Sequence, residues 1–431
     1  MKPKTFSIIS LGCPKNTVDS EVLKGYLKFY RMDYDPEPEN ADVIIINTCG
    51  FIESAREESV ETILETLELK KTDPQKKVII TGCLSQRYPE QLRIELPEAD
   101  GIFGVDATDS IVKSIINSSE SCDDVERIRS LLTPGHIAYL KIAEGCDNQC
   151  SFCSIPLIRG KQQSRSIDSL KREASYLKEK GVKELILIAQ DLTRYGSDLG
   201  LGTDLHLLLD ELLSAKLFPW VRLLYTNPDF WDGKINRLFQ KYPELCPYLD
   251  IPIQHASPRI LKLMERGNNI KRIKQKLLQL RKDVPEIALR TSVMVGFPSE
   301  SPEDFNMLLD FIEEIRFERL GVFTYSQEED TRAAKFRDGV PEAEKERRKD
   351  LIMQLQWAIA REFAESKIGQ IIDVITEEKD ENGYIGRSRW DTPEIDGIVN
   401  LGSDKILEIG QVYSVVVDAV DGIDLIARVR E

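Results

Sequence analysis

Residues 144–153 read EGCDNQCSFC and place three cysteines, Cys146, Cys150 and Cys153, at C-x3-C-x2-C spacing. Three thiolates on so short a loop can hold three irons of a 4Fe-4S cubane, whereas a cluster held only by protein usually takes four cysteines. One iron would stay open for a substrate or cofactor, and S-adenosylmethionine is one cofactor of radical chemistry. A structural zinc site wants four ligands, commonly in two close pairs, which fits this spacing poorly.

The cysteine loop follows an apolar stretch, IAYLKIA at 137–143, which is the first of six that alternate with helical patterns. The others are ELILIAQ (184–190), WVRLLYT (220–226), YLDIPIQ (248–254), IALRTSVMVG (287–296) and RLGVFTYS (319–326). Six strand and helix pairs predict an open or partial α/β (TIM-like) barrel over residues 136–366, closed by a charged helix at about 341–366. In such barrels chemistry sits at the carboxyl ends of the strands.

Several polar residues occupy those predicted strand ends and are candidates to bind a cofactor. Gln190 and Asp191 end the second strand, Asn227 ends the third, and His255 follows the fourth. Two further candidates come from the fifth strand: Arg290 lies within it, and Gly296 ends it where a glycine lets the backbone approach a ligand closely.

Residues 1–120 alternate short apolar runs with helical patterns such as LSQRYPEQLRIEL (84–96), which predicts a parallel sheet with helices on its faces. Cys13, Cys49 and Cys83 each follow one of the first three strands, and each lies beside a glycine. A single cysteine there is often just a buried apolar residue. Because the carboxyl ends of parallel strands meet at one edge, we expect these three to converge on a second 4Fe-4S cluster.

Residues 121–135 are polar and predict a linker, in which Cys122 is expected to be an incidental surface thiol. Cys246 is expected to be a packed thiol. Residues 367–431 show short strands separated by turn residues, which predicts a small antiparallel β-barrel. This segment carries seven Lys or Arg against fourteen Asp or Glu, a net charge of −7, so it should repel phosphates and suit a basic protein.

Charge and cysteine usage bound the function further. The whole chain has a net charge of −15, which opposes a generic nucleic-acid binder because backbone affinity comes from Lys and Arg. Its longest apolar runs, such as VIII at 43–46, are far below the roughly 18 residues of a membrane span. Eight cysteines in triplets and at strand ends suit metal binding in a reducing cytoplasm. A lipidated Cys13 is disfavoured, because the preceding apolar stretch FSIISLG is at the bottom of the roughly 7 to 15 residues that the h-region of a signal peptide requires and carries no spacer.

Five strings together resemble one family, the radical S-adenosylmethionine methylthiotransferases, over essentially the whole chain. They are SLGCPKNTVDSE, INTCGFIESAREES, TGCLSQRY, KIAEGCDNQCSFCSIPLIRGKQQSRS and VMVGFPSESPEDF. The first and fourth are most similar to the subgroup that modifies the small-subunit ribosomal protein S-twelve. In that family the last domain is a TRAM-like barrel, generally regarded as RNA-binding, and the acidity of residues 367–431 departs from it.

The resemblance implies an enzyme with two 4Fe-4S clusters and S-adenosylmethionine that methylthiolates the β-carbon of an aspartate. Cys146, Cys150 and Cys153 would hold the cluster that generates the radical, and the cluster on Cys13, Cys49 and Cys83 would carry the sulfur. A basic ribosomal protein would be the substrate, an external donor would supply electrons, and no membrane is involved. Two alternatives stay open: a tRNA adenosine methylthiotransferase, and a non-catalytic iron-sulfur redox protein.

Overall fold

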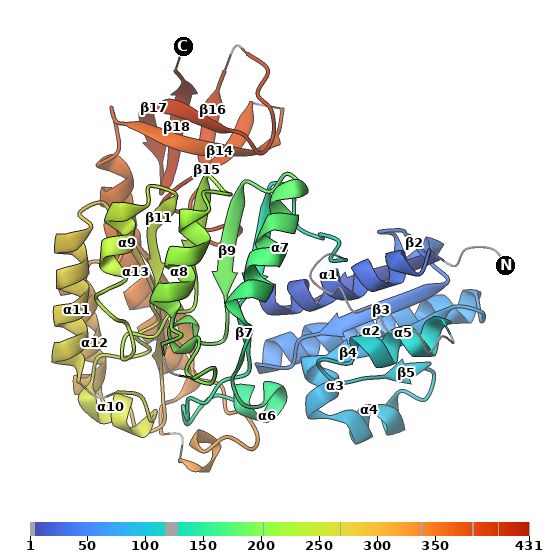
Figure 1. Cartoon of the computed structure of the whole chain (residues 1–431). Helices are drawn as coiled ribbons and strands as arrows, with labels where there is room; N and C mark the ends of the chain where they lie inside the picture. The colour runs from blue at the N-terminus through green and yellow to red at the C-terminus, as the bar shows by residue number, and fades with distance from the viewer. Residues whose placement is uncertain are drawn as a thin grey trace. The chain divides into compact units, whose positions relative to one another are not determined.

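The computed structural model describes residues 5–116, 128–200, 202–267, 269–337, 339–381, 383–403 and 405–430 (Figure 1). Contacts divide the chain into two units, one of residues 1–133, 139–148 and 153–176, and one of residues 134–138, 149–152 and 177–431. Cys122 and residues 121–127 of the expected linker lie outside the described residues.

The first unit is built on a five-stranded parallel sheet of order β2-β1-β3-β4-β5. Its strands are β1 (Thr5–Ser10), β2 (Asp33–Tyr34), β3 (Val43–Thr48), β4 (Lys77–Gly82) and β5 (Gly101–Ile102). Its helices are α1 (Pro14–Phe29), α2 (Glu53–Thr72), α3 (Cys83–Arg87), α4 (Pro89–Glu95) and α5 (Thr108–Ile116). The parallel sheet expected for the N-terminal part is therefore confirmed.

Helices cover both faces of this sheet. Successive side chains of a strand point to opposite faces, so each strand can contribute to two cores. Val43 and Ile45 of β3 pack in one core with residues of α1 and α5, whereas Ile46 packs in another with residues of α2, α3 and α4. All six residues of β3 are buried, as expected for a strand covered on both faces.

The first unit also contains the chain on either side of the cysteine loop. Its elements are the end of β6 (Ile137–Lys141), the two-stranded sheet of β7 (Ala143–Glu144) and β8 (Gln163–Ser164), α6 (Ile155–Arg159), and α7 (Ile167–Glu179), whose last residues belong to the second unit. The loop from 145 to 154 lies between β7 and α6 and contains no regular element.

The second unit contains an open six-stranded sheet of order β13-β12-β11-β10-β9-β6, with parallel pairing from β9 to β13. After β6, its strands are β9 (Glu184–Ile188), β10 (Trp220–Leu223), β11 (Leu245–Asp250), β12 (Ala288–Val295) and β13 (Arg319–Thr324). Its helices are α8 (Leu205–Ser214), α9 (Asn236–Lys241), α10 (Pro258–Leu263), α11 (Ile270–Asp283), α12 (Pro302–Ile315) and α13 (Glu342–Glu365). An open sheet in sequential strand order confirms the partial α/β barrel.

The C-terminal segment forms a closed five-stranded barrel of order β14-β15-β16-β18-β17. Its strands are β14 (Ile371–Lys379), β15 (Tyr384–Ser388), β16 (Val399–Gly402), β17 (Val412–Asp421) and β18 (Asp424–Val429). The expected barrel is confirmed, but the expectation of wholly antiparallel pairing is wrong, since β16 and β18 pair in parallel. A closed ring with an odd number of strands cannot alternate direction throughout, so one parallel pair is unavoidable.

Buried ion pairs join this barrel to the amino-terminal ends of the sheet strands within the second unit. Arg387 of β15 bonds Glu184, the first residue of β9, and Asp391 accepts bonds from Arg319, the first residue of β13. The barrel therefore contacts the sheet at the ends opposite to those where chemistry is expected. Among the described residues, no helix is both long and apolar enough to cross a membrane.

Candidate functional site

The three N-terminal cysteines lie at the carboxyl edge of the first sheet. Cys13 precedes the first residue of α1, Cys49 directly follows β3, and Cys83 begins α3 directly after β4. Strands β1, β3 and β4 are neighbours in the sheet. The fold thus gathers three thiols that are 36 and 34 residues apart in sequence, because each strand delivers its cysteine to the same edge.

Two glycines allow the loops that carry these thiols to pack against one another. Gly12 has φ +85°, and a Cβ atom there would lie only 2.8 Å from the Sγ atom of Cys49. A Cβ atom on Gly50 would lie 2.9 Å from the carbonyl carbon of Cys83. The glycines noted beside the cysteines therefore have a steric cause, which is the close approach of neighbouring loops.

Burial shapes the acidity of two of these thiols. Cys49 and Cys83 are 8% and 5% exposed, and burial raises the pKa of both, that of Cys83 to about 11. The nearby Cys13 also raises the pKa values of both thiols, because its negative charge opposes theirs. Arg159 opposes the effect at Cys83, because its positive charge lowers the pKa of the thiol.

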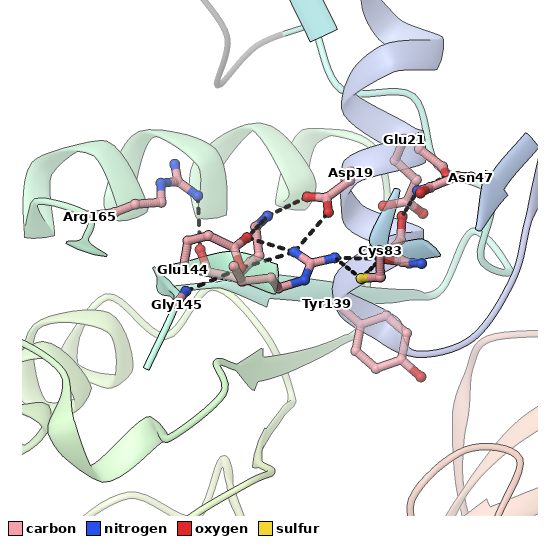
Figure 2. A network of polar contacts seen from close by, with 12 residues as sticks. Asp19, Glu21, Asn47, Cys83, Tyr139, Glu144, Gly145 and Arg165 are labelled. Carbon is pink, nitrogen blue, oxygen red and sulfur yellow. Dashed lines mark hydrogen bonds and ion pairs between the residues drawn. The ribbon is translucent and has the colours of Figure 1, made fainter. Parts of the chain in front are cut away.

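Arg159 connects Cys83 to a set of partly buried charges within the first unit, of which Figure 2 labels Asp19 and Glu144. Its Nη2 atom lies 3.4 Å from the Sγ atom of Cys83 and also donates to the side chain of Asn16. Its Nη1 atom donates to Asp19 at 3.1 Å and to both carboxylate oxygens of Glu144 at 2.9 Å. The Arg159 side chain is only 1% exposed, so these bonds replace its hydration.

Lys141 completes this set, which we call the Arg159 network and define as Asp19, Lys141, Glu144 and Arg159. Lys141 pairs with both carboxylates, at 2.6 Å from Glu144. Burial opposes ionisation of Glu144, but Lys141 and Arg159 together lower its pKa to about 2. Glu144 is therefore ionised at neutral pH and pairs with two cations near Cys83.

The second cysteine set, on the loop from 145 to 154, begins at a tight crossing of two chain segments. The backbone N–H of Cys146 donates to the carbonyl of Gly160 at 3.1 Å. Gly145 has φ +69°, and a Cβ atom there would lie 2.1 Å from the carbonyl oxygen of Lys161. The glycine of EGC is thus required by the close approach of the returning chain.

N–H groups approach the thiols of this loop in each unit. In the first unit, the backbone N–H of Asn148 donates to the Sγ atom of Cys146 at 3.4 Å. In the second, Nη1 of Arg266 lies 3.8 Å from the Sγ atom of Cys150, while Nη2 is fixed on the carbonyl of Pro252. Such donors suit thiolates, so the surroundings fit the sulfur ligands of an iron-sulfur cluster.

Among the described residues, no three His, Cys, Asp or Glu side chains are arranged to hold one metal ion. The thiolates of a cubane each bind a different iron, so they stand farther apart than the ligands of a single ion.

Some of the predicted cofactor residues meet at the carboxyl ends of β9 and β10. Asn227 donates from its side-chain amide to Asp191 at 3.1 Å, and Asp191 accepts a 3.0 Å bond from the backbone N–H of Thr193. Both Asp191 and Asn227 are buried. Gln190, which directly precedes Asp191 in sequence, is partly exposed, so three candidates share this edge.

His255 and Gly296 lie farther along the same edge and have packing roles there. Nδ1 of His255 accepts 2.9 Å bonds from the backbone N–H groups of Ala256 and Ser257, just before α10. Gly296 has φ +73°, and a Cβ atom there would lie 2.3 Å from the side chain of Lys345 on α13. The close approach at Gly296 is therefore to a lysine of this chain.

Arg290 lies near the amino end of β12, away from the other candidates. Its Nη1 atom donates to Asp250 at 2.9 Å, and its Nε atom lies 3.7 Å from Asp396 of the C-terminal segment. This side chain thus pairs with one carboxylate of β11 and lies near another in the C-terminal segment.

The sequence did not single out the Arg159 network, although Arg159 lies in the string IPLIRG beside the cysteine loop. Its members come from α1, β6, β7 and α6 and are up to 140 residues apart. The only local signal was two charged residues close together before the loop, Lys141 and Glu144, which pair within one short segment.

The second unit also has a cavity of about 330 Å³ between the β10–α9 loop and α11, whose lining includes Phe230, Arg272 and Lys276 but no predicted site residue.

Three family models match the chain in sequence. Residues 5–104 match an uncharacterized protein family, UPF0004, residues 140–312 match the radical SAM superfamily, and residues 368–429 match the TRAM domain. The radical SAM match implies a 4Fe-4S cluster and S-adenosylmethionine as cofactors.

Solved structures support the same architecture. The chain is similar to the radical S-adenosylmethionine methyltransferase TsrM from Kitasatospora setae, with a TM-score of 0.54 over 88% of this chain and 79% of that one, at 13% identity. It is also similar to the cobalamin-dependent S-adenosylmethionine radical enzyme OxsB, with a TM-score of 0.51 over 77% of this chain and 55% of that one, at 12% identity. These likenesses concern the fold.

Curated relatives match over nearly the whole length. The ribosomal protein uS12 methylthiotransferase RimO of Clostridioides difficile is 44% identical over 434 residues, covering 97% of each chain. The protein of the same name from Desulforamulus reducens is 42% identical, covering 99% of this chain and all of the relative. With this identity over such coverage, the chain belongs to the ribosomal protein uS12 methylthiotransferase family.

Proposed function

We propose that this chain is a radical S-adenosylmethionine enzyme that methylthiolates the β-carbon of an aspartate in ribosomal protein uS12. The observation that carries this proposal is the pair of three-cysteine sets in a chain that aligns end to end with relatives of that name. The relatives' substrate, a protein of the ribosome, also supports a cytoplasmic location. The tRNA-modifying alternative is not favoured by the relatives, nor by the charge of −7 on residues 367–431.

Two cubanes are part of this proposal. Cys146, Cys150 and Cys153 would hold the cluster that binds S-adenosylmethionine, and Cys13, Cys49 and Cys83 would hold the second. When bound, these groups supply a carbon-centred radical and the sulfur to be transferred. The chain's own contribution is to present three thiols per cluster, which leaves one iron of each without a protein ligand.

The edge formed by Gln190, Asp191 and Asn227 is our proposed place for polar groups of S-adenosylmethionine. Asp191 and Asn227 orient one another through their 3.1 Å bond, so a ligand would meet a fixed pair of polar groups. His255 and Gly296 remain candidates at the same edge. Arg290 remains a candidate too, although its two carboxylate partners give it a structural role without any ligand.

Domain boundaries and partners complete the proposal. We propose an N-terminal domain of residues 1–120, a linker of 121–135, a radical SAM domain of 136–366 and a C-terminal barrel of 367–431. An external electron donor would reduce the cluster, and the acidic barrel would attract the basic substrate, because opposite charges speed association.

Anaerobic reconstitution with iron and sulfide tests the cluster assignment. We expect about eight irons per chain, and about four after replacing either cysteine set by alanine. Cys146→Ala, Cys150→Ala and Cys153→Ala together should abolish 5'-deoxyadenosine formation, whereas Cys13→Ala, Cys49→Ala and Cys83→Ala should preserve it and abolish sulfur transfer. Cys246→Ala is the control, because this buried thiol of β11 belongs to neither set.

The substrate is tested by offering uS12 and bulk tRNA to the reconstituted enzyme at the same salt concentration. Mass spectrometry of both products should find one methylthio group on an aspartate of uS12 and none on tRNA. Methylthioadenosine in the tRNA digest, with unmodified uS12, would overturn the assignment. A full-length enzyme with four irons would overturn the two-cluster part alone.

A further inference from the structure

One arginine bridges the two cysteine sets along the chain. Arg159 is the last residue of α6 and follows Cys153 by six residues, yet its side chain reaches Cys83 on the N-terminal sheet. Arg159 and Cys83 both belong to the first unit. The following residue, Gly160, accepts the backbone bond from Cys146, so the same segment also supports the base of the cysteine loop.

The two terminal nitrogens of the Arg159 guanidinium, Nη1 and Nη2, have different partners. The Nη1 end is held by Asp19 and Glu144, with Glu144 accepting through both oxygens at 2.9 Å. This leaves Nη2 directed at the Sγ atom of Cys83, 3.4 Å away, and at Asn16. A planar guanidinium fixed at one end presents the donors of its other end in a set direction.

The side chain of Asn16 is also held in place by hydrogen bonds, so Cys83 has an oriented polar neighbour in addition to Arg159. Its side-chain amide donates to the carbonyls of Leu11 at 3.0 Å and Thr48 at 2.9 Å, the latter next to Cys49. Its carbonyl oxygen faces both Arg159 and Cys83, whose Sγ atom is 3.6 Å away. The thiol of Cys83 therefore lies between a fixed amide and a fixed cation in a water-poor environment.

Hydrogen bonds to cluster sulfurs and nearby charges are among the factors that set the potential of an iron-sulfur centre. A cation that donates to a ligating thiolate favours the reduced state, because reduction adds negative charge to the cluster. Its effect is strong when both partners are buried, since little water screens it.

We propose that Arg159 is a positioning residue for the N-terminal cluster, where it donates to the Cys83 thiolate and raises the reduction potential of that centre. The inference rests on the proposed function, because it requires that Cys13, Cys49 and Cys83 hold a cluster. Arg159 is not a ligand in this scheme. Its place on the segment that carries Cys153 makes the environment of one cluster depend on the loop that holds the other.

The test measures the potential of the N-terminal centre by itself. A full-length parent carrying Cys146→Ala, Cys150→Ala and Cys153→Ala is reconstituted anaerobically, its iron is counted, and its midpoint potential is determined by EPR-monitored titration. Arg159→Met in this parent should retain about four irons and shift the midpoint to a more negative value. Arg159→Lys, which keeps the charge but loses the planar donor, should give an intermediate value.

Lys141→Met is the matched control. It removes a partly buried cation that pairs with the same two carboxylates, Asp19 and Glu144, but whose described bonds do not reach Cys83. A clearly smaller shift in Lys141→Met than in Arg159→Met supports the proposal. Equal shifts in both variants, or no shift in Arg159→Met, would overturn it, because the contact with sulfur would then have no specific effect.

Failure of the underlying function gives a different result. If the parent itself binds no iron, then the N-terminal cysteines hold no cluster and the two-cluster proposal fails with this one. If the parent binds iron but Arg159→Met does not, the midpoint potential of Arg159→Lys is compared with that of the parent instead. Equal midpoint potentials in these two proteins would overturn the inference.

Discussion

Glu184 shows how a single carboxylate can be kept ionised inside this protein. It is fully buried and accepts bonds from Arg222 at 2.7 Å and from Arg387 of the barrel. Burial by itself would raise its pKa, but Arg387 and Arg222 lower it to about 2. The charge of Glu184 is therefore compensated, and removing it would leave two buried cations facing each other.

We predict that Glu184→Gln lowers the free energy of unfolding at pH 7 by about 3–5 kcal/mol. Glu365→Gln, which breaks the exposed pair with Arg361 on α13, should cost at most about 1 kcal/mol. Urea denaturation of both variants checks this difference. A loss below about 1 kcal/mol in Glu184→Gln would show that the buried pair does not stabilise the native fold.

The same carboxylate predicts a pH dependence with a defined sign. A folded pKa of about 2, below the ordinary value of 4.5, means that the stabilisation by Glu184 is complete above about pH 4.5. It is lost as the pH falls from about 4.5 through about 2. Over that window the stability difference between the protein and Glu184→Gln should shrink, as measured by urea denaturation at stepped pH.

A substitution of Gly12 tests whether close packing of the loops positions Cys13, Cys49 and Cys83. A methyl group would meet the Sγ atom of Cys49 at a backbone angle that other residues rarely adopt. We expect Gly12→Ala to displace Cys49 and to lower the reconstituted iron content to about half. Gly135→Ala is the control, since nothing lies within 4 Å of its added methyl, and it should keep full iron.

Among the elements, prolines decided boundaries that apolar patterns did not reveal. Residues 84–96 read as one helical pattern, but α3 ends at Arg87 and α4 begins at Pro89, because proline lacks the N–H of a helix interior. Strand β11 starts at Leu245, three residues before the predicted stretch, and so includes Cys246. It ends at Asp250, two residues before Pro252.

Two helices of the first unit are tied together by a buried arginine. Arg129 donates to Glu21 of α1 and, at 2.6 Å, to Glu173 of α7, and it is 2% exposed. Burial acts against its charge, yet the two carboxylates raise the pKa of Arg129. The contact joins α1, which follows Cys13, to α7, the second helix after the cysteine loop in sequence.

We expect Arg129→Met to destabilise the protein by about 3–5 kcal/mol, because it leaves Glu21 buried without Arg129 and Glu173 paired with Arg165 alone. Adding Glu21→Gln and Glu173→Gln should recover part of that loss, since neutral amides are cheaper to bury than unpaired charges. Thermal unfolding of the single and triple variants provides the comparison. No recovery in the triple variant would mean that packing, and not charge, causes the loss.

For the molecule as a whole, acidity is the feature that bears on its partner. Asp373 of β14 and Asp418 and Asp421 of β17 are exposed on the barrel, where β14 and β17 are paired strands. Exposed charges act mainly on the rate of association with a charged partner and on its salt dependence. The barrel's charge should therefore matter for binding a basic protein and not for forming the clusters.

Replacing Asp373, Asp418 and Asp421 by Asn should raise the KM for uS12 about tenfold at low salt, at about 0.5 kcal/mol per exposed charge. The control carries Glu57→Gln, Glu61→Gln and Glu65→Gln, which remove the same charge from the exposed side of α2. Kinetics at two salt concentrations check both sets. Equal effects of the two triplets would assign the result to net charge and not to the barrel.

The sequence by itself determined the kinds of element, the three larger sheets and the positions of both cysteine sets, but not the small β7–β8 sheet. Strand runs, turn residues and C-x3-C-x2-C spacing are local patterns, and the convergence of Cys13, Cys49 and Cys83 follows from the geometry of parallel strands. The parallel β16–β18 pair was missed, although ring closure with five strands requires it.

Tertiary structure alone decided which charges became partners. Arg159 meets Cys83, Arg129 meets Glu21, and Arg290 meets Asp396 across 76 to 108 residues of chain. No periodic pattern encodes such pairs, because a charged side chain reads as solvated until packing removes its water. The cluster ligands could be proposed from spacing, but what surrounds them depends on which distant segments the fold brings together.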